Sequence, residues 1–567
     1  MDAPSSPSKG ADAPVNIAWT LAEVAQRLPN KPAIVCAAGR GAGGKYRYVS
    51  YTFDALERRC RRFARGLGAL GIGRGTRTLL FVPPSIDFFP LTFALFRVGA
   101  VPVMIDPGLG REGLLRAVAE SEPEAMIGVP KAHLARLLFP RAFKSVRTHV
   151  TVGRRLGWGG ATLEDLERHS DAPLELEPTS AGDMAAILFT SGSTGAAKGA
   201  VYTHGIFDAQ VRIIRREWGI GEDEIDLPAF PLFALFSAGL GVTCVVPDMD
   251  ASRPGAVDPR KIVEQIRDHR PTYSFGSPAF WTRVASHCRK EHLTLESLRR
   301  VFIAGAPVSP RLVTEVRAVL GSDADVFIPY GATESLPVSW ISGREIVEDT
   351  RVRTERGEGI CVGRPIAESE VRVIAIKDEP LGALSDAERL GPGEIGEIIV
   401  RGAVTTEQYF RRPEDDARAK IHDPGTGAIW HRMGDLGWLE PSGRLWFCGR
   451  KAHRVVTRSG TLYTIPCEAI FNQHPSVRRS ALVGLGPRGE QRPVIVIECH
   501  GEVRPRGRAA EAALRRELLE LGQRSVLTAG IRDLLFHPSF PVDVRHNAKI
   551  KRELLADWAE TQRDLHR

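Results

Sequence analysis

The sequence lacks any C-x-x-C pair, although it contains eight cysteines in 567 residues. Scattered cysteines in so long a chain argue against a zinc site and against a disulfide framework. We therefore expect reduced thiols in a cytoplasmic protein.

Long apolar runs and runs of one charge are also missing. The most apolar stretch, "DFFPLTFALFRVGAVPVMIDP", contains an arginine and three prolines, so we expect no transmembrane segment but a buried helix that leads into a strand. The formal net charge of +8 is spread along the chain without a long basic run, which gives little support to a nucleic-acid partner. Residues 1–14, "MDAPSSPSKGADAP", are polar and rich in proline, and they are predicted to form a disordered tail.

The composition is that of a globular protein, with 43% hydrophobic and 25% charged residues. The chain is long enough for two or more domains. From Phe53 onward, apolar residues recur at helical spacing, with Thr52 as a candidate N-cap and Gly71 as the stop. The strand-like "RTLLFVPP" follows, and similar strands recur in "DMAAILFTS", "PTYSFGSPAF", "LRRVFIAGAPVSP" and "ADVFIPYGATE". This alternation predicts an α/β fold with parallel-type sheets covered by helices.

The pattern changes twice along the chain. Shorter strands and glycine turns begin after about residue 345, and strand–helix alternation returns beyond Arg450. We predict a large N-terminal domain over residues 15–449, which includes a β-rich subdomain, and a small C-terminal α+β domain over residues 450–567.

The stretch "ILFTSGSTGAAKGAVYTH", residues 187–204, surrounds Lys198 with glycines and hydroxyls. Such a loop favours phosphate, because backbone N–H groups, hydroxyls and an ammonium group all donate to anionic oxygens. It is neither a P-loop, since Gly199 follows Lys198, nor a G-x-S-x-G elbow. A polar turn between two strands is the alternative. Ligands of parallel sheets bind where strands end, and "AGAP" and "YGATE" also follow strands.

With these segments in order, the sequence resembles the adenylate-forming superfamily of acyl-CoA synthetases, luciferases and nonribosomal adenylation domains. The resemblance covers about residues 15 to 560 and rests on "FTSGSTGAAKG", "AGAP", "YGATE", "GDLGWLEPSGRLWFCGR" and "RHNAKIKRELL". It implies that a carboxylate is activated by ATP with Mg²⁺, through positioning and charge neutralisation rather than through a protein nucleophile. It also implies that the small C-terminal domain rotates.

The same resemblance assigns nucleotide-binding residues. The Ser/Gly-rich loop would hold the β- and γ-phosphates, Tyr330 would stack on adenine, and Asp435 would accept hydrogen bonds from the ribose hydroxyls. Arg450 would lie near the ribose and the phosphates. The full ATP-binding set that the resemblance implies is Thr190, Ser191, Gly192, Ser193, Thr194, Gly195, Lys198, Gly305, Ala306, Pro307, Tyr330, Gly331, Asp435 and Arg450.

Three residues are assigned to catalysis on the same basis. Lys549 matches the lysine that reaches the α-phosphate and the acyl oxygens, Thr333 would contact the α-phosphate, and Glu334 would bind Mg²⁺ as a hard oxygen ligand. Residue type alone allows simpler interpretations, such as a solvated loop glutamate or a surface lysine.

Two segments depart from the family pattern. The hinge region "GRKAHRVVTRSGTLYTIP" leaves open whether Lys451, Ala452 or His453 is the hinge residue. In "PLFALFSAGLG" an alanine replaces the usual histidine and the loop is expected to be extended. An apolar face there suits an alkyl chain, and the candidate pocket residues are Phe233, Ala234 and Phe236. Ordinary core packing is the alternative.

Several stretches, among them "VYTHGIFDAQ", "FPLFALF" and "FPVDVRHNAKIKREL", look like those of the β-lactone synthetases of bacterial long-chain olefin biosynthesis. This resemblance implies a 2-alkyl-3-hydroxy fatty acid substrate, whose own hydroxyl attacks the acyl-adenylate to close a β-lactone. It also implies other enzymes of that pathway as partners, such as a β-lactone decarboxylase and an NADPH-dependent reductase. A fatty acyl-CoA ligase is the alternative, because it shares every nucleotide motif. A non-catalytic nucleotide-binding protein is disfavoured, because Lys198, Glu334, Asp435 and Lys549 are all present.

Overall fold

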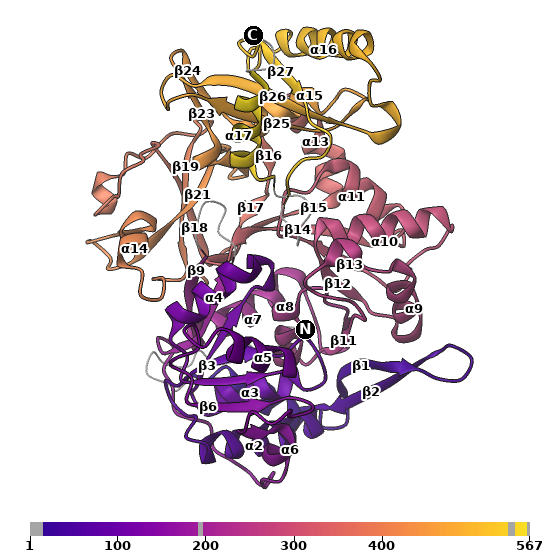
Figure 1. The fold of residues 1–567 in the computed structure, drawn as a ribbon, viewed down its shortest axis with the longest axis vertical. Coiled ribbons are helices and arrows are strands. Elements are labelled where there is room, and N and C mark those ends of the chain that lie inside the picture. Colours follow the sequence, from indigo (N-terminus) through magenta and orange to yellow (C-terminus); the bar gives the residue numbers. More distant parts are fainter. Residues whose placement is uncertain (1–14, 191–196, 543–549, 564–567) are drawn as a thin grey trace. The chain divides into compact units, whose positions relative to one another are not determined.

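The computed structural model describes residues 15–190, 197–542 and 550–563 (Figure 1). Internal contacts divide the chain into two compact units. Unit 1 comprises residues 1–252, 258–275 and 403–416, and unit 2 comprises residues 253–257, 276–402 and 417–567. The predicted division into domains 15–449 and 450–567 stays a prediction.

A seven-stranded sheet forms the centre of unit 1. Its neighbouring strands are parallel, except for the antiparallel pair at the β9 edge. In sheet order the strands are β7 (Ala161–Thr162), β6 (Thr148–Thr151), β5 (Ala125–Gly128), β3 (Arg77–Phe81), β4 (Val101–Ile105), β8 (Met184–Thr190) and β9 (Lys198–Thr203). The predicted parallel-type arrangement is confirmed for this sheet.

Five further strands of unit 1 lie in the order β12 (Tyr273–Gly276), β10 (Ile225–Asp226), β11 (Thr243–Val246), β1 (Pro32–Arg40) and β2 (Tyr46–Thr52). Their pairings are parallel up to β1, and β1 and β2 form an antiparallel hairpin that projects from the unit (Figure 1).

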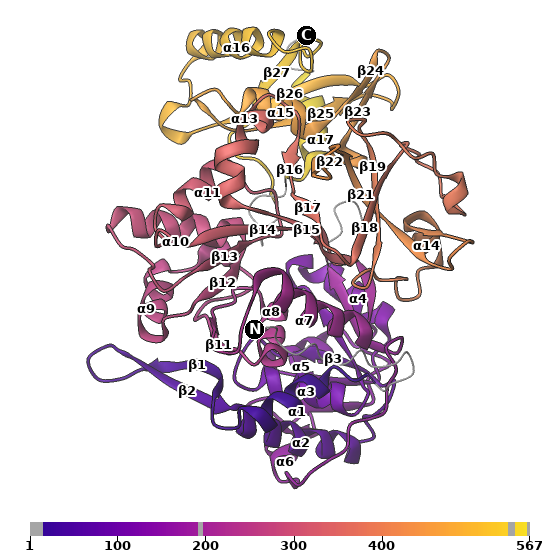
Figure 2. The same ribbon diagram turned by 180° about the vertical axis from the view of Figure 1, so that it is seen from behind.

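The helices of unit 1 follow the local signals of the sequence. The Thr52 hydroxyl accepts a hydrogen bond from Ala55 N at the start of α2, and Gly71 follows the helix with φ +76°, as predicted. α3 is buried along its whole length and leads into β4, which confirms the interpretation of the most apolar stretch. Helices α1, α2, α3 and α6 pack together (Figure 2). The helices are α1 (Ala18–Arg27), α2 (Phe53–Ala69), α3 (Phe88–Arg97), α4 (Gly110–Ser121), α5 (Pro130–Leu138), α6 (Leu163–Glu167), α7 (His204–Trp218), α8 (Pro231–Leu240) and α9 (Pro259–His269).

Unit 2 begins with strands β17 (Arg364–Pro365), β15 (Ser335–Ser342), β14 (Asp325–Ala332) and β13 (Arg300–Ile303), in that sheet order. β13 and β14 are parallel, and β14 and β15 form an antiparallel hairpin. The helices of this part are α10 (Pro278–Lys290), α11 (Pro310–Arg317), α12 (Gly343–Glu345) and α13 (Arg351–Glu355).

The β-rich texture after residue 345 corresponds to an antiparallel sheet in unit 2. Its order is β16 (Ile360–Cys361), β22 (Leu445–Arg450), β21 (Ile429–Leu439), β19 (Gly396–Gly402) and β18 (Ser369–Ile374), and β20 (Lys420–His422) pairs with β21. The short helix α14 (Pro413–Ala419) precedes β20.

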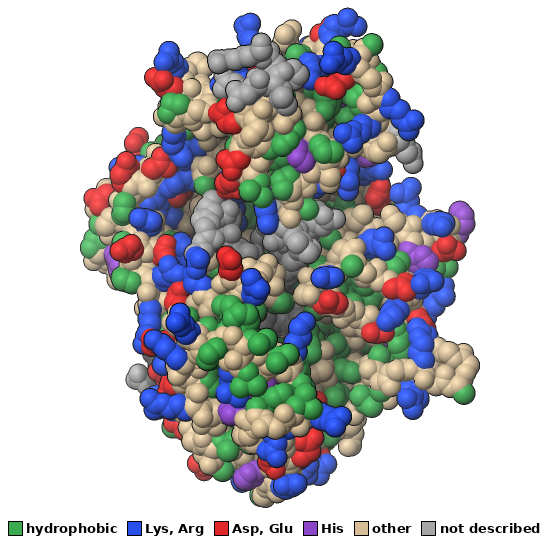
Figure 3. All heavy atoms as spheres, viewed as in Figure 1, with side chains coloured by type: hydrophobic (Ala, Val, Ile, Leu, Met, Phe, Trp, Pro, Cys, Tyr) green, Lys and Arg blue, Asp and Glu red, His purple; other side chains and the backbone are tan. Residues whose placement is uncertain are grey.

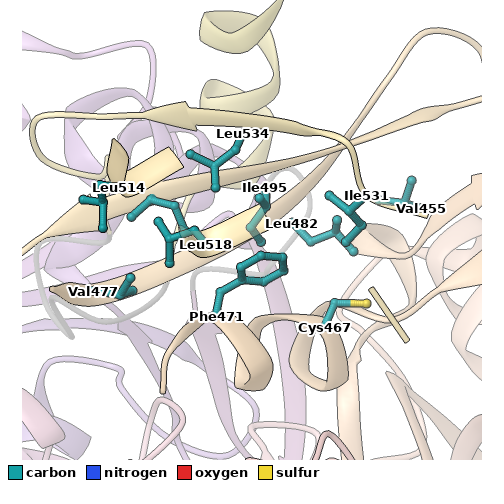
Figure 4. Close-up of a cluster of buried hydrophobic side chains, with 11 residues drawn as sticks. Val455, Cys467, Phe471, Val477, Leu482, Ile495, Leu514, Leu518, Ile531 and Leu534 are labelled. Carbon is teal, nitrogen blue, oxygen red and sulfur yellow. The ribbon is translucent and has the colours of Figure 1, made fainter. Parts of the chain in front are cut away.

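The C-terminal part of unit 2 is a three-stranded sheet with helices on both faces. Residues alternate between the faces: Leu482 and Ile495 pack with Phe471 and Leu518 on one side (Figure 4), whereas Leu555 belongs to the core on the other side. Burial on both faces explains the continuous apolar runs of these strands. The elements are the hairpin β23 (Val455–Thr457) and β24 (Gly460–Leu462), the sheet strands β25 (Val477–Leu485), β26 (Arg492–Cys499) and β27 (Asp533–Phe536), and helices α15 (Thr464–Phe471), α16 (Arg508–Gln523) and α17 (Arg552–Arg563).

Among the described residues, no helix combines the length and the apolarity needed to cross a bilayer. Lys and Arg side chains are scattered over the face drawn in Figure 3 and are mixed with acidic and hydrophobic ones.

Candidate active site

The Ser/Gly-rich stretch connects two antiparallel strands of unit 1. β8 ends at Thr190, β9 begins at Lys198, and these residues are paired in the register of the hairpin. The connection therefore starts at the carboxyl end of β8, which is parallel to β4, and ligands bind at such ends in α/β folds. The other predicted loop residues lie outside the described residues: Ser191, Gly192, Ser193, Thr194 and Gly195. Their phosphate-binding role stays a prediction.

Lys198 is paired with an aspartate more than two hundred residues away in the sequence. Its Nζ lies 2.8 Å from Asp415 Oδ1 and 5.1 Å from the centre of the Tyr409 ring. Lys198 and Asp415 are both partly exposed, so water weakens the attraction between them. A polyphosphate carries several negative charges and can compete with a single carboxylate for this lysine.

Asp415 and Tyr409 lie on the segment 403–416, which is held against β9. Phe410 N donates to Gly199 O over 2.8 Å, and Val201 N donates to Gln408 O over 3.2 Å. Gly199 is required at this strand, because a Cβ there would meet Ile187 and Phe189 at 2.7–2.8 Å. Sequence reasoning missed Asp415 and Tyr409; the acidic "PEDD" run is visible in the sequence, but no spacing rule connects it with Lys198.

In unit 2, the structure brings together three residues that the sequence assigns to the nucleoside. The Tyr330 hydroxyl donates to Asp435 Oδ2 over 2.7 Å. Arg450 Nη1 lies 2.9 Å from Asp435 Oδ1 and donates to the Met433 carbonyl over 3.1 Å. Asp435 is almost fully buried, whereas 29% of the Arg450 side chain is exposed. The site is a buried carboxylate held between a phenol and a guanidinium.

The electrostatics of this cluster keep its donors protonated. Burial, followed by the nearby Asp435 carboxylate, raises the pKa of Tyr330 well above its usual value. The Asp435 carboxylate raises the pKa of Arg450, and Glu334 adds to this shift. Tyr330 therefore remains a hydroxyl donor and Arg450 a cation at neutral pH.

Strand register places Asp435 opposite Arg450. The two residues pair across β21 and β22, and a register shift follows between Leu436 and Gly437. A Cβ at Gly437 would lie 2.2 Å from the Trp446 carbonyl oxygen, so only glycine fits there. Asp435 is thus a residue of strand β21 and not of a turn before Gly437.

A network at the end of the same hairpin supports this register. Glu440 accepts hydrogen bonds from Arg444 Nε (2.9 Å), Trp446 Nε1 (3.0 Å) and Arg353. These donors outweigh the effect of burial and lower the pKa of Glu440 to about 2. Sequence reasoning did not single out this glutamate, because its partners come from separate segments.

β13 and β14 are parallel with Arg300 opposite Asp325, and β14 continues past the end of β13. Each strand is followed by one of the predicted loops. The first carries Gly305, which has φ +95°, followed by Ala306 and Pro307. The second carries Thr333 and Glu334 in the turn between β14 and β15.

At the second loop, a Cβ on Gly331 would lie 2.5 Å from the Ser335 carbonyl oxygen, which requires glycine. Glu334 follows Thr333 in the turn between β14 and β15, and its charge adds to the upward shift of the Arg450 pKa that Asp435 mainly causes. Within unit 2, the structure therefore brings Tyr330 of "YGATE" together with Asp435 of "GDLG" and with Arg450.

The three hinge candidates form a short 3-10 turn, Lys451–His453. Lys451 Nζ donates to Glu397 Oε2 over 3.0 Å, and burial lowers the Lys451 pKa. His453 Nε2 lies 3.2 Å from Glu553 of α17, and burial lowers the His453 pKa to about 4. Ala452, between them, is exposed. Which of the three is the hinge residue stays open.

The candidate acyl segment is helix α8 rather than an extended loop. Its start and end have local causes: Pro231 occupies the first turn and Gly241, with φ +75°, ends the helix. The Phe233 ring stacks on Phe275 with centres 4.0 Å apart, and Phe236 lies 5.9 Å from Phe233. Ala234 is buried. An alkyl-binding role for Phe233, Ala234 and Phe236 stays a prediction.

Lys549 lies outside the described residues. The chain on both sides of it is placed: Val542 and Ile550 form a β-bridge, and the Arg552 guanidinium pairs with the buried Glu468. The catalytic role of Lys549 stays a prediction.

Comparison with known proteins shows what the chain resembles. Residues 21–410 match a family model described as AMP-binding enzyme. The olefin beta-lactone synthetase of Stenotrophomonas maltophilia (strain K279a) is 47% identical over 556 residues, which are 97% of this chain and 99% of that protein. The olefin beta-lactone synthetase of Xanthomonas campestris pv. campestris is 46% identical over 553 residues, 97% of this chain and 98% of that protein.

Among solved structures, the amide bond synthetase McbA from Marinactinospora thermotolerans has a TM-score of 0.77 at 23% identity. The match covers 96% of this chain and 99% of that chain, so the two chains share one fold.

Proposed function

The chain belongs to the AMP-binding enzyme family, and on this basis we propose that it is an ATP-dependent, AMP-forming ligase that makes a β-lactone. The substrate is a 2-alkyl-3-hydroxy fatty acid, and the other products are AMP and pyrophosphate. The observation that carries this proposal is the identity of 46–47% to two olefin beta-lactone synthetases over nearly the full length of both chains.

We assign recognition of the nucleoside to the cluster in unit 2. Asp435 has a buried carboxylate that is already oriented by Tyr330 and Arg450, and a carboxylate suits the two hydroxyls of a ribose as an acceptor. The Tyr330 ring supplies an aromatic face for adenine, and the Arg450 cation suits the phosphate next to the ribose.

We assign phosphate binding in unit 1 to the loop between β8 and β9. Lys198 would exchange Asp415 for the phosphates of ATP and afterwards for pyrophosphate. This exchange is supported by the difference in charge. Asp415 offers Lys198 one carboxylate, whereas ATP and pyrophosphate carry several negative charges.

The reaction needs two displacements. In the first, a substrate carboxylate oxygen attacks the α-phosphorus and pyrophosphate leaves. In the second, the 3-hydroxyl oxygen attacks the acyl carbon, the C–O bond to AMP breaks, and the hydroxyl proton is lost. Lys549 would stabilise the charge on the α-phosphate and the acyl oxygen, and Thr333 would contact the α-phosphate. Because both reacting groups belong to one molecule, no acceptor has to bind.

The carboxylate of Glu334, in the turn after β14, is a suitable ligand for Mg²⁺. Glu334 offers one hard carboxylate in a turn, and Mg²⁺ is commonly held by one or two carboxylates together with substrate phosphates. When bound, Mg²⁺ would neutralise charge on the phosphates. The chain's own contribution is to carry Glu334 in the turn that follows β14.

Glu334→Gln should raise the Mg²⁺ concentration needed for half-maximal activity by about tenfold or more, because an amide is a weaker ligand than a carboxylate. The measurement is pyrophosphate release over a Mg²⁺ titration, with Glu348→Gln as a control at an exposed glutamate of unit 2. An unchanged Mg²⁺ requirement would show that the carboxylate of Glu334 is structural.

The test of the proposed function is to find out which group accepts the activated acyl group, the substrate's own 3-hydroxyl or the thiol of CoA. With ATP, Mg²⁺ and a 2-alkyl-3-hydroxy acid, the enzyme should give the β-lactone whether or not CoA is added. The matched 2-alkyl acid without the 3-hydroxyl should give adenylate but no lactone, because the attacking oxygen is missing. Mass spectrometry of the acyl products distinguishes the outcomes. A CoA thioester as the main product, with no lactone, would assign the chain to the alternative, a fatty acyl-CoA ligase.

We further propose a cytoplasmic enzyme that works between two others. A 3-hydroxy acid is the product of a 3-keto reduction, for which an NADPH-dependent reductase is the expected supplier. A β-lactone can lose carbon dioxide to give an olefin, which is the reaction of a β-lactone decarboxylase. This placement between two other enzymes is supported by the names of the two olefin beta-lactone synthetases that the chain resembles, which refer to olefins.

A further inference from the structure

Helix α5 of unit 1 exposes leucines that nothing in the proposed reaction uses. Leu134, Leu137 and Leu138 are 52%, 52% and 64% exposed. Their spacing of three and four residues places them on one side of the helix, while Ala132, on the opposite side, and His133, at the edge of the leucine side, are buried. Most large apolar side chains of a water-soluble surface are scattered singly, so a group of this kind marks a contact surface.

A fourth exposed leucine lies on the loop after β6. Leu156 is 59% exposed. Two residues later, the Trp158 ring stacks on His133 of α5, with centres 5.2 Å apart and planes at 11°. This stacking holds the loop that carries Leu156 against the beginning of α5.

The same part of the chain carries an unusual excess of positive charge. Residues 125–163 contain seven Lys and Arg residues and no Asp or Glu. Six of the seven are exposed: Lys131, Arg141, Lys144, Arg147, Arg154 and Arg155. In the part of the chain that the structure describes, none of these six is in an ion pair. The pKa of Glu122 is lowered mainly by its hydrogen bond with Arg411 and to a smaller extent by Lys144. The pKa of Asp165 is lowered mainly by hydrogen bonds with Thr162 and to a smaller extent by Arg155.

The topology places these charges at both ends of the leucine group. α5 connects the parallel strands β5 and β6 and therefore runs antiparallel to them. Its beginning lies near the loop after β6, which carries Arg154 and Arg155, and its end leads to Arg141 and Lys144. The four leucines and the six basic residues are called the α5 patch below.

We propose that the α5 patch docks unit 1 on the surface of an anionic lipid bilayer. Apolar side chains that insert among the lipid headgroups and basic side chains that attract anionic lipids are the two signals that stable interfacial binding requires, and the α5 patch supplies both. Charge complementarity decides against a second copy of this chain as the occupant, because two copies of the α5 patch would bring like charges together. This inference does not depend on the β-lactone chemistry.

The experiment is sedimentation of the full-length protein with vesicles of phosphatidylcholine, alone or mixed with phosphatidylglycerol, at low and high salt. The protein should bind the mixed vesicles at low salt, and binding should weaken at high salt. The triple variant Leu134→Ser/Leu137→Ser/Leu138→Ser should bind about tenfold more weakly. The double variant Arg154→Gln/Arg155→Gln should lose about fivefold for each charge.

Matched controls separate the α5 patch from the general positive charge of the protein. Val352→Ser/Val526→Ser/Leu554→Ser replaces three exposed apolar residues of unit 2, and Arg504→Gln/Arg506→Gln removes two exposed charges there. Both controls should bind the mixed vesicles as the unchanged protein does. Turnover of a short, water-soluble acid without vesicles should be the same in all variants.

Three results would overturn the proposal. They are the absence of binding to the mixed vesicles at low salt, equal losses in the patch and control variants, and a change of the solution mass in the leucine variant, which would assign the α5 patch to self-association. Thermal unfolding identifies a variant that fails to fold; in that case Leu138→Ser alone, the most exposed position, provides the comparison.

Discussion

Asp435→Asn should lower kcat/KM for ATP by about 10², because hydrogen bonds from the ribose to a charged acceptor contribute about 1.5–3 kcal/mol each. The amide keeps the shape of the side chain and can still accept from Tyr330, but it removes the negative charge that faces Arg450 at 2.9 Å. The loss should therefore appear mainly in the KM for ATP. The measurement is ATP-dependent pyrophosphate release over a range of ATP concentrations.

The same substitution should lower the free energy of unfolding by about 1–3 kcal/mol. Removing one partner of a fully buried ion pair costs about 3–5 kcal/mol, but 29% of the Arg450 side chain is exposed, and water compensates part of the loss. Denaturant unfolding measures this quantity.

Glu440→Gln is the matched control on the same hairpin. It weakens the contacts to Arg353 and Arg444 and should lower the stability by a similar amount without changing the KM for ATP. If Asp435→Asn behaves in the same way, with only its stability affected, the Asp435 carboxylate supports the hairpin and does not bind the nucleotide.

Lys549→Ala should lower the rate of adenylate formation by about 10²–10³, which is the usual effect of losing one group that stabilises charge in the transition state. The assignment rests on the position of Lys549 in "RHNAKIKREL". Folding should be little affected, because the β-bridge of Val542 with Ile550 and the pair of Arg552 with Glu468 hold the flanking chain. The measurement is pyrophosphate exchange together with thermal unfolding.

Lys551→Ala is the control, since Lys551 is an exposed lysine two residues away. It should retain nearly full activity. A larger loss in Lys551→Ala than in Lys549→Ala would show that the motif is displaced by two residues and that the catalytic lysine has been assigned to the wrong position.

Local elements were predictable because their causes are local. The Thr52 cap, the apolar spacing and the stop at Gly71 act within one helix, and α2 has the bounds that they indicate. The strand that ends at Thr190 and the glycines that follow it are likewise visible in the sequence as a strand end with a polar loop. The local pattern was not sufficient for "PLFALFSAGLG". Its glycines suggested a loop, but the segment forms helix α8.

The motif order also identified the nucleotide residues, but it did not provide their contacts. Tyr330 and Asp435 are 105 residues apart and share one hydrogen bond. Asp435 faces Arg450 because β21 and β22 pair in one register, which a shift of a single residue would destroy. Sequence spacing alone does not encode that register; the packing of the hairpin and the donors around Glu440 stabilise it.

The sequence alone therefore specified the fold class, the motif order and the chemical types of the candidate site, because these depend on residue identity and on short-range spacing. Its three-dimensional packing was needed to show that Lys198 is held by Asp415, that Asp435 lies between a phenol and a guanidinium, and that the leucines of α5 remain exposed beside basic residues. The physical reason is that such contacts join segments far apart in the chain, and their free energy is gained only when the strands and helices that carry them have packed together.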